Sequence, residues 1–226
     1  MKALALRWFK FNVVGGLGVA IQMGCLALLY KGLHLNYLVA TALAISLVIA
    51  FPLGIWTARR PALYVAAMTA TGVLYTIPAL ALFALLIPFM GLGKAPAITA
   101  LVLYSLLILV RNIAIGIREV PAELIEAADG MGYGKGRRLI RIELPMALPV
   151  IVAGIRITAV TQIAVATVAA YINAGGLGDI IFQGITQDFG EKIAAGAVLT
   201  SLLAIAADES LKHIERRLRT ATSERI

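Results

Sequence analysis

Charged residues are scarce in this chain: only 14% of its 226 residues are Asp, Glu, Lys or Arg, whereas 61% are hydrophobic. A soluble domain rarely exceeds about half apolar residues, and long runs without charge are typical of membrane helices. The composition therefore excludes an ordinary soluble domain. It predicts an all-α integral membrane fold.

Acidic residues are absent from the first half of the chain. None of the twelve occurs before Glu119, and all of them lie in loops, near the ends of apolar segments or in the C-terminal tail. Carriers driven by protons or sodium ions usually keep an ionisable carboxylate inside the bilayer for the coupling ion. The distribution argues against a carrier of that class.

Residues for redox, metal and nucleotide chemistry are also few. Cys25 is the single cysteine, so no intrachain disulfide can form, and His34 and His213 are isolated on opposite sides. The run GYGKG at 132–136 lacks the first glycine and the Ser/Thr of a phosphate-binding P-loop. We therefore expect no metal site, no cofactor and no catalysis in this chain.

Aromatic residues make up only 7% of the chain and do not cluster. An aromatic cage of the kind that binds cations through cation–π attraction is therefore not expected in this chain.

Six apolar segments are long enough, or nearly so, for the roughly twenty residues of a membrane span. They cover about 11–30, 37–58, 62–90, 95–117, 146–172 and 192–208. The third is longer than a span requires and contains Gly72 and Pro78, which predicts a kink or a tilt. The last is short and rich in alanine.

Basic residues fall at the ends of these segments. This placement argues against nucleic acid as a partner, despite a formal net charge of +8, because no basic face interleaved with aromatics is present. With the N-terminus in the cytosol, only Lys31, Lys94 and Lys192 of the twenty lysines and arginines lie outside, and Arg156 lies within a span. The positive-inside rule then predicts an N-in/C-in topology, with residues 118–145 in the cytosol.

The longest polar passage, residues 118–145, separates the fourth and fifth apolar segments. The run AELIEAA at 122–128 follows Pro121 and predicts a short helix with acidic residues near its N-terminus. Glycines then predict a tight reversal into a second, basic helix that ends at Pro145 and Pro149. Two short helices in an L between spans predict a docking surface rather than a catalytic pocket. The glycines are 130, 132, 134 and 136, and the basic residues are Lys135, Arg137, Arg138 and Arg141.

Within this passage the pattern reads E-A-A, three residues, G, nine residues, I-x-L-P. Its members are Glu126, Ala127, Ala128, Gly132, Ile142, Leu144 and Pro145. The pattern resembles the EAA signature of the permease subunits of bacterial ABC importers. The resemblance implies a type I permease core in the bacterial cytoplasmic membrane, whose EAA loop docks on an ABC ATPase subunit. It also implies an extracytoplasmic substrate-binding protein and a second permease copy or homologue. The alternative is an amphipathic loop that contacts only lipid headgroups.

The segments 75–98, 107–121 and 154–185 resemble permeases of glycine betaine, carnitine and choline importers. One departure from that branch is Tyr75, where a glutamine is expected. The branch implies quaternary-ammonium osmoprotectants as substrates. A permease for an amino acid or another small solute is the alternative.

The first forty residues differ from the rest. RWFKFNVVGGLGVAIQ followed by HLNYLVATALA is similar to the opening of GtrA-like membrane proteins, and the alternative is a generic first span with small-residue packing. A GtrA-like carrier that works without ATP is therefore a second possible class of function. We expect residues 1–43 to form an atypical N-terminal span, residues 44–210 the permease domain and residues 211–226 a basic cytosolic tail.

A permease needs a weak and mostly neutral path for its solute. The polar residues in or near the predicted spans that are candidates for this path are Tyr75, Thr76, Asn112, Thr161, Gln162 and Tyr171. Arg156 is expected to have a structural role, by reaching towards the inner surface or bonding to backbone. Asp208 and Glu209 are expected to form solvated pairs with basic residues one helical turn further on.

Overall fold

The computed structural model describes residues 37–223, and those residues are helical without any strand. The long helices are α2 (Tyr37–Ala58), α3 (Pro61–Thr76), α5 (Lys94–Arg118), α8 (Leu144–Ala169) and α10 (Gly190–Ser223). The shorter elements are α4 (Ala79–Met90), α6 (Ala122–Gly130), α7 (Lys135–Arg138), the π-helix η1 (Leu139–Glu143), the 3₁₀-helix η2 (Ala170–Ile172) and α9 (Gly178–Thr186). The predicted all-α fold is confirmed for this part of the chain.

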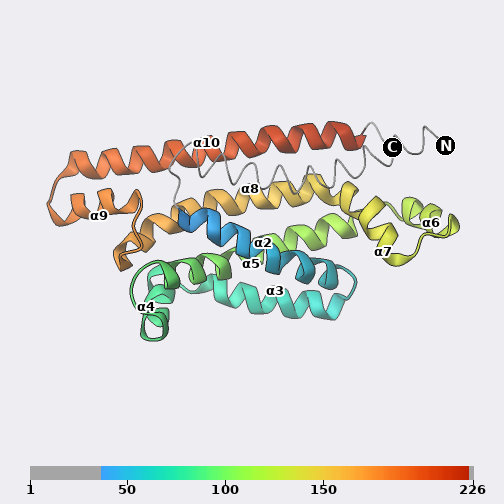
Figure 1. Cartoon of the computed structure of the whole chain (residues 1–226), viewed down its shortest axis with the longest axis horizontal. Coiled ribbons are helices and arrows are strands. Elements are labelled where there is room, and N and C mark those ends of the chain that lie inside the picture. Colours follow the sequence, from blue (N-terminus) through green and yellow to red (C-terminus); the bar gives the residue numbers. More distant parts are fainter. Residues whose placement is uncertain (1–36, 224–226) are drawn as a thin grey trace.

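The long helices lie side by side along one axis of the molecule (Figure 1). α2 packs on α5, α5 on α8, and α8 on α10, while α3 packs on α5 from the opposite side. The EAA loop with α6 and α7 lies at one end of this bundle, and α4, η2 and α9 lie at the other (Figure 1). The loop and the elements joining the last spans are thus separated by the length of the bundle.

The core lies between α2, α5 and α8. Its largest fully buried apolar side chains are Phe83, Leu101, Leu109, Ile113 and Ile163. Glycines bring the backbones close together: a Cβ atom placed on Gly54 of α2 would lie 2.6 Å from Ile113, and one on Gly154 of α8 would lie 2.5 Å from Asn112. Small residues at helix contacts are the usual means by which membrane helices pack tightly.

Four described helices are long and apolar enough to cross a membrane, and the count rises to five if the bent pair α3 and α4 is one span. The predicted spans 37–58 and 95–117 correspond closely to α2 and α5. The predicted segment 62–90 is broken by a 95° bend between α3 and α4. The break falls at Ile77–Pro78, as the proline predicted, whereas Gly72 lies within α3. The predicted span 11–30 and the GtrA-like stretch lie outside the described residues.

The prediction that the second helix of the EAA loop ends at Pro145 is wrong. Helical structure continues from Lys135 to Ile172, a stretch of 38 residues, so both Pro145 and Pro149 lie inside it. Proline lacks the N–H that an α-helix needs and crowds the preceding turn. The π-helix directly before Pro145, with Leu144 N–H bonded to the Leu139 carbonyl, is a wider turn that accommodates this defect.

The last predicted span, 192–208, is only part of α10. Within the described residues this helix runs unbroken from Gly190 to Ser223 and packs along α8. Arg156 of α8 pairs with it: Nε lies 3.3 Å from Asp208 Oδ1, and Nη1 lies 3.2 Å from Glu215 Oε2. Arg156 therefore has a structural contact, but to carboxylates rather than to backbone or the inner surface.

The predicted local pairing of the tail is confirmed only in part. Glu209 pairs with Lys212 at 2.7 Å, three residues further along α10. Asp208 instead forms an ion pair with Arg156 on α8, which is not the local pair along α10 that was predicted. A contact between two helices could not be read from spacing within one of them.

Candidate functional site

The EAA loop turns at Gly132. Gly132 follows the end of α6 with φ of 75°, the left-handed region that favours glycine. The N–H of Tyr133 donates to the Ala128 carbonyl at 3.0 Å, and the N–H of Gly132 donates to the Asp129 carbonyl at 2.9 Å. These two bonds are the Schellman arrangement that ends a helix. The turn sets the angle between α6 and α7, the next helix of the loop.

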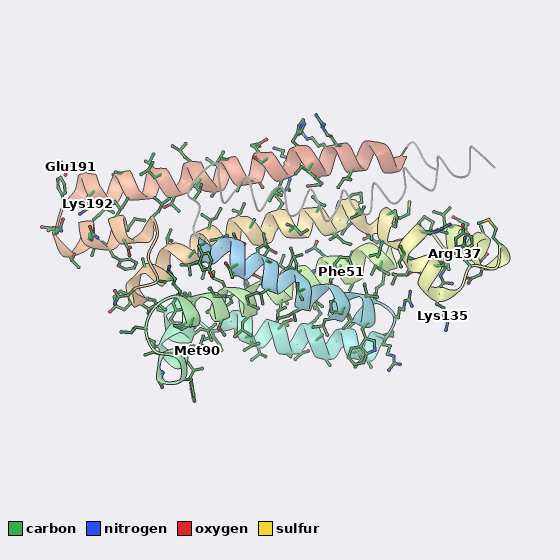
Figure 2. All side chains as sticks on the ribbon, viewed as in Figure 1. Phe51, Met90, Lys135, Arg137, Glu191 and Lys192 are labelled. Carbon is green, nitrogen blue, oxygen red and sulfur yellow. The ribbon has the colours of Figure 1, made fainter. Side chains whose placement is uncertain are left out.

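The tip of the loop exposes both apolar and charged side chains. Met131 is 66% exposed and Ile140 is 64% exposed. Lys135 and Arg137 lie at this end of the molecule (Figure 2). The loop therefore exposes both apolar and basic side chains that are available to a partner.

The seven residues of the EAA signature differ in exposure. Glu126, Ala127 and Gly132 are exposed, and Ala128 of α6 is fully buried. The partly buried members, at the start of α8 and in the π-helix before it, are Ile142, Leu144 and Pro145. The exposed group is available to a partner, whereas the second group joins the loop to a long helix.

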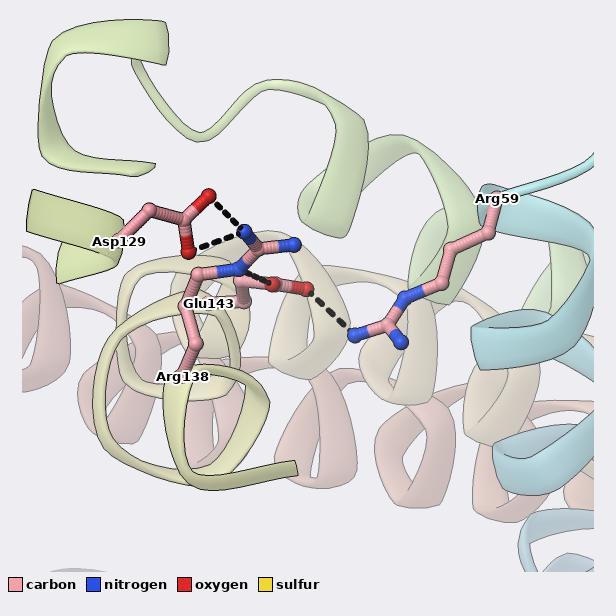
Figure 3. Close-up of polar contacts among 4 residues, drawn as sticks. All are labelled: Arg59, Asp129, Arg138 and Glu143. Carbon is pink, nitrogen blue, oxygen red and sulfur yellow. Dashed lines mark hydrogen bonds and ion pairs between the residues drawn. The ribbon is translucent and has the colours of Figure 1, made fainter. Parts of the chain in front are cut away.

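A chain of ion pairs holds the loop together (Figure 3). Arg138 of α7 donates from Nη1 to both oxygens of Asp129 on α6, at 2.7 and 2.6 Å, and from Nε to Oε1 of Glu143 at 2.8 Å. Arg59 donates from Nη2 to the other oxygen of Glu143 at 3.2 Å. Glu143 is only 3% exposed, and a carboxylate buried without such partners would be strongly destabilising.

Arg59 and Arg60 are the two residues between α2 and α3, and we call them the α2–α3 corner. Arg118, at the end of α5, binds the same region. Its Nε donates to the Ala58 carbonyl and its Nη2 to the Thr57 carbonyl, both at 3.0 Å. Its guanidinium also stacks on Tyr64, 4.1 Å from the ring centroid. The corner is therefore joined both to α5 and, through Glu143, to the EAA loop.

Sequence reasoning missed the members of this network. Arg59 and Arg118 were counted only as positive charges near span ends, Arg138 only as a basic residue of the second loop helix, and Glu143 was not singled out. A signal for Glu143 was present, because it is a lone carboxylate between Ile142 and Leu144 at the start of an apolar run. Its partner Arg59 lies 84 residues earlier, and spacing alone could not reveal it.

The six candidate path residues do not form one site. Although all six are described, no hydrogen bond or ring contact joins any two of them. Gln162 is 2% exposed and donates to the hydroxyl of Ser105, so it lies inside the bundle. Asn112 donates to the Ile108 carbonyl at 2.8 Å, and Thr161 to the Ile157 carbonyl at 2.8 Å, each on its own helix.

The exposed members of this set lie towards the end opposite the EAA loop. Thr76 ends α3 and bonds to the Val73 carbonyl. Tyr75 packs edge-on against Tyr104, with ring centroids 5.6 Å apart, and Tyr104 donates to the Ile77 carbonyl at the α3–α4 break. Tyr171 is 68% exposed and lies 5.5 Å from the ring of Phe182 on α9. Tyr75 and Tyr171 thus belong to two separate aromatic pairs.

The fold is similar to that of a solved transporter. The chain superposes on a permease chain in inward-facing structures of the MetNI methionine ABC transporter with a TM-score of 0.73. The match covers 80% of this chain and 91% of that chain at 24% sequence identity. At this identity it shows a shared fold and nothing further.

Relatives found by sequence have a higher identity to this chain than the solved transporter has. Over 178 residues the chain is 42% identical to a carnitine transport permease protein of Listeria monocytogenes, covering 79% of this chain and 82% of the relative. It is 39% identical to a choline transport system permease protein of Bacillus subtilis, covering 88% and 92%. It is 41% identical to an osmoprotectant import permease protein of Salmonella typhimurium, covering 79% and 86%.

A family model described as binding-protein-dependent transport system inner membrane component matches residues 50–220. This range contains α3 to α9, the C-terminal part of α2, most of α10 and the whole EAA loop. The chain therefore belongs to this family of ABC importer permease subunits, and it is a multi-pass protein of the inner membrane.

Proposed function

We propose that the chain is the pore-forming subunit of an ATP-driven importer of quaternary-ammonium osmoprotectants such as glycine betaine, carnitine and choline. The observation that carries the proposal is an identity of about 40%, over roughly four fifths of the chain or more, to permeases named for carnitine, choline and osmoprotectants. In this proposal residues 44–210 are the permease domain, residues 118–145 its coupling loop and residues 211–226 a cytosolic tail.

Two permease subunits, either identical or homologous, would form the pore, and a separate binding protein would deliver the solute from outside. ATP would bind and be hydrolysed in a separate ATPase subunit. The N-in/C-in topology stays a prediction, and it would place the EAA loop on the side of the membrane where ATP is present.

The EAA loop would dock on the ATPase. Glu126 is exposed and available for a polar contact, and Gly132 holds the turn that directs α6. The exposed side chains of Met131 and Ile140 offer an apolar contact beside these residues. Closure of two ATPase subunits would move both loops and shift the spans between inward and outward access.

Co-purification with the neighbouring ATPase in mild detergent tests the coupling part of this proposal. We expect the wild-type chain to retain the ATPase and Gly132→Asp to lose it, because the variant adds a side chain and a negative charge at an exposed turn that favours glycine. Membrane insertion of the variant should be unchanged. An ATPase that stays bound to Gly132→Asp, with normal uptake, would contradict the role of this loop.

The alternative substrate, an amino acid, has weaker support. The solved relative is a methionine transporter, but at 24% identity it supports only the fold. Competition for uptake by unlabelled methionine, set beside competition by choline, separates the two substrate classes.

A further inference from the structure

The feature that the proposed function leaves unexplained is the second arginine on Glu143. Glu143 is buried, and burying an unpaired carboxylate costs several kcal/mol. One close arginine with good geometry already balances its charge, since Arg138 Nε lies 2.8 Å from Oε1. Arg59 Nη2 at 3.2 Å from Oε2 is an additional partner whose own side chain is partly exposed.

The two arginines connect Glu143 to different parts of the molecule. Arg138 lies five residues from Glu143 and also holds Asp129, so it keeps the EAA loop folded on itself. Arg59 lies outside the loop, at the α2–α3 corner, 84 residues from Glu143 (Figure 3). Its contact with Glu143 instead joins the loop to the start of α3 and the end of α2.

The corner is suited to pass on a displacement. Arg118 fixes it to the end of α5 through the Thr57 and Ala58 carbonyls. α3, which starts at the corner, has only Thr71 as a buried residue, and it contacts the bundle through partly buried side chains such as Met68 and Tyr64, the latter stacked on Arg118. At its far end α3 meets α4 at a 95° bend. A shift of the corner would therefore act on a helix that few fully buried side chains hold in place.

We propose that Glu143 and Arg59 are positioning residues that transmit movement of the EAA loop to the α2–α3 corner and hence to α3. This inference rests on the proposed function, because it assigns a second route by which an ATPase docked on the loop moves the spans. The first route is covalent and runs through the π-helix into α8. The Glu143–Arg59 contact adds α2 and α3 to the elements that follow the loop.

Arg59→Ala is the test, and Arg60→Ala is its matched control. Both remove one arginine from the same corner, but Arg60 only faces the Trp56 ring, at 5.9 Å from its centroid. Arg59→Ala leaves the contacts of Glu143 and Asp129 with Arg138 intact. The loop should therefore stay folded and keep its docking surface.

The assay uses the complete importer, with the ATPase and the binding protein, reconstituted into proteoliposomes. Uptake of labelled choline and ATP hydrolysis are measured on the same sample, and their ratio gives the solute moved per ATP. For Arg59→Ala we expect bound ATPase and ATP hydrolysis at the wild-type level, with uptake per ATP lower by about fivefold or more, the lower range of coupling between sites. Arg60→Ala should match the wild type, and Arg59→Lys should recover part of the ratio.

Glu143→Gln gives an independent check. If both residues act through one contact, their effects should not add. The double variant Arg59→Ala/Glu143→Gln should then move at least as much solute per ATP as whichever single variant has the lower ratio. A ratio for Arg59→Ala equal to that of Arg60→Ala would overturn the inference. So would a parallel fall of uptake, ATP hydrolysis and thermal stability, because that pattern indicates a merely structural role. A wild-type complex without ATP-driven uptake would instead overturn the proposed function, and the inference with it.

Discussion

Arg156 of α8 lies with its Nε 3.3 Å from Oδ1 of Asp208 on α10. Its Nη1 also lies 3.2 Å from Oε2 of Glu215, which is about two turns further along the same helix. α10 carries few buried side chains, among them Leu203, Ala207 and Leu211. The two ion pairs therefore join α10 to α8 in addition to the apolar contacts of these residues.

Arg156→Leu should weaken this attachment. The change leaves Asp208 and Glu215 without their partner on α8, and we expect a loss of about 1–3 kcal/mol in the free energy of unfolding, because all three side chains are partly accessible. Thermal unfolding in detergent measures the loss. Lys212→Ala, which breaks only the exposed pair with Glu209, is the control and should change the midpoint little. Equal shifts for both variants would show that Arg156 does not anchor α10.

Gly132→Ala tests the turn of the EAA loop. The left-handed φ of 75° costs a residue with a side chain about 1–2 kcal/mol, although nothing near the glycine would clash with a Cβ atom. We expect Gly132→Ala to lower ATP-driven uptake and Gly132→Asn to lower it less, since Asn tolerates this conformation better. Gly130→Ala is the matched control, because Gly130 is helical and equally open. Uptake reduced equally by both alanine variants would contradict the role of the turn.

Gly154→Val tests the contact between α5 and α8. The Cβ atom would lie 2.5 Å from Asn112 Cβ and 2.8 Å from its Cγ, so the helices must separate. Overpacking of this kind costs about 1–3 kcal/mol, which thermal unfolding detects. Gly72→Ala is the control, since a Cβ atom there meets nothing within 4 Å. If Gly154→Val unfolds at the wild-type temperature, the close approach of the two helices is not required.

Gln162→Leu separates path residues from core residues. Gln162 is sealed inside the bundle, and Ser105 keeps its own bond to the Leu101 carbonyl when the amide is removed. We expect uptake to stay within about twofold of the wild type, because an apolar side chain of similar size leaves no buried polar group without a partner. Tyr171→Ala, at an exposed position, is the comparison. A complete loss of uptake with Gln162→Leu, without a loss of stability, would place Gln162 on the path.

The sequence was sufficient for features that depend on local chemistry. α2 and α5 match their predicted limits because each is an apolar run with a polar or basic residue near each end. The break at Pro78 and the turn at Gly132 follow from the backbone properties of proline and glycine.

Features that depend on contacts between distant segments could not be predicted. Pro145 was expected to end a helix, but a π-turn before it lets the helix continue. Arg156 and Asp208 lie on different helices, and Glu143 meets Arg59 only when the EAA loop folds back on the corner. Spacing along one helix has no information on which second helix lies opposite.

The most direct test of the central claim is uptake of labelled glycine betaine, carnitine and choline into proteoliposomes that contain the chain, its ATPase and its binding protein. We expect uptake that requires ATP, that stops when the ATPase is omitted, and that unlabelled quaternary ammonium compounds inhibit but methionine does not. Uptake that continues without the ATPase would contradict the importer mechanism. Uptake of methionine alone would contradict the proposed substrate class.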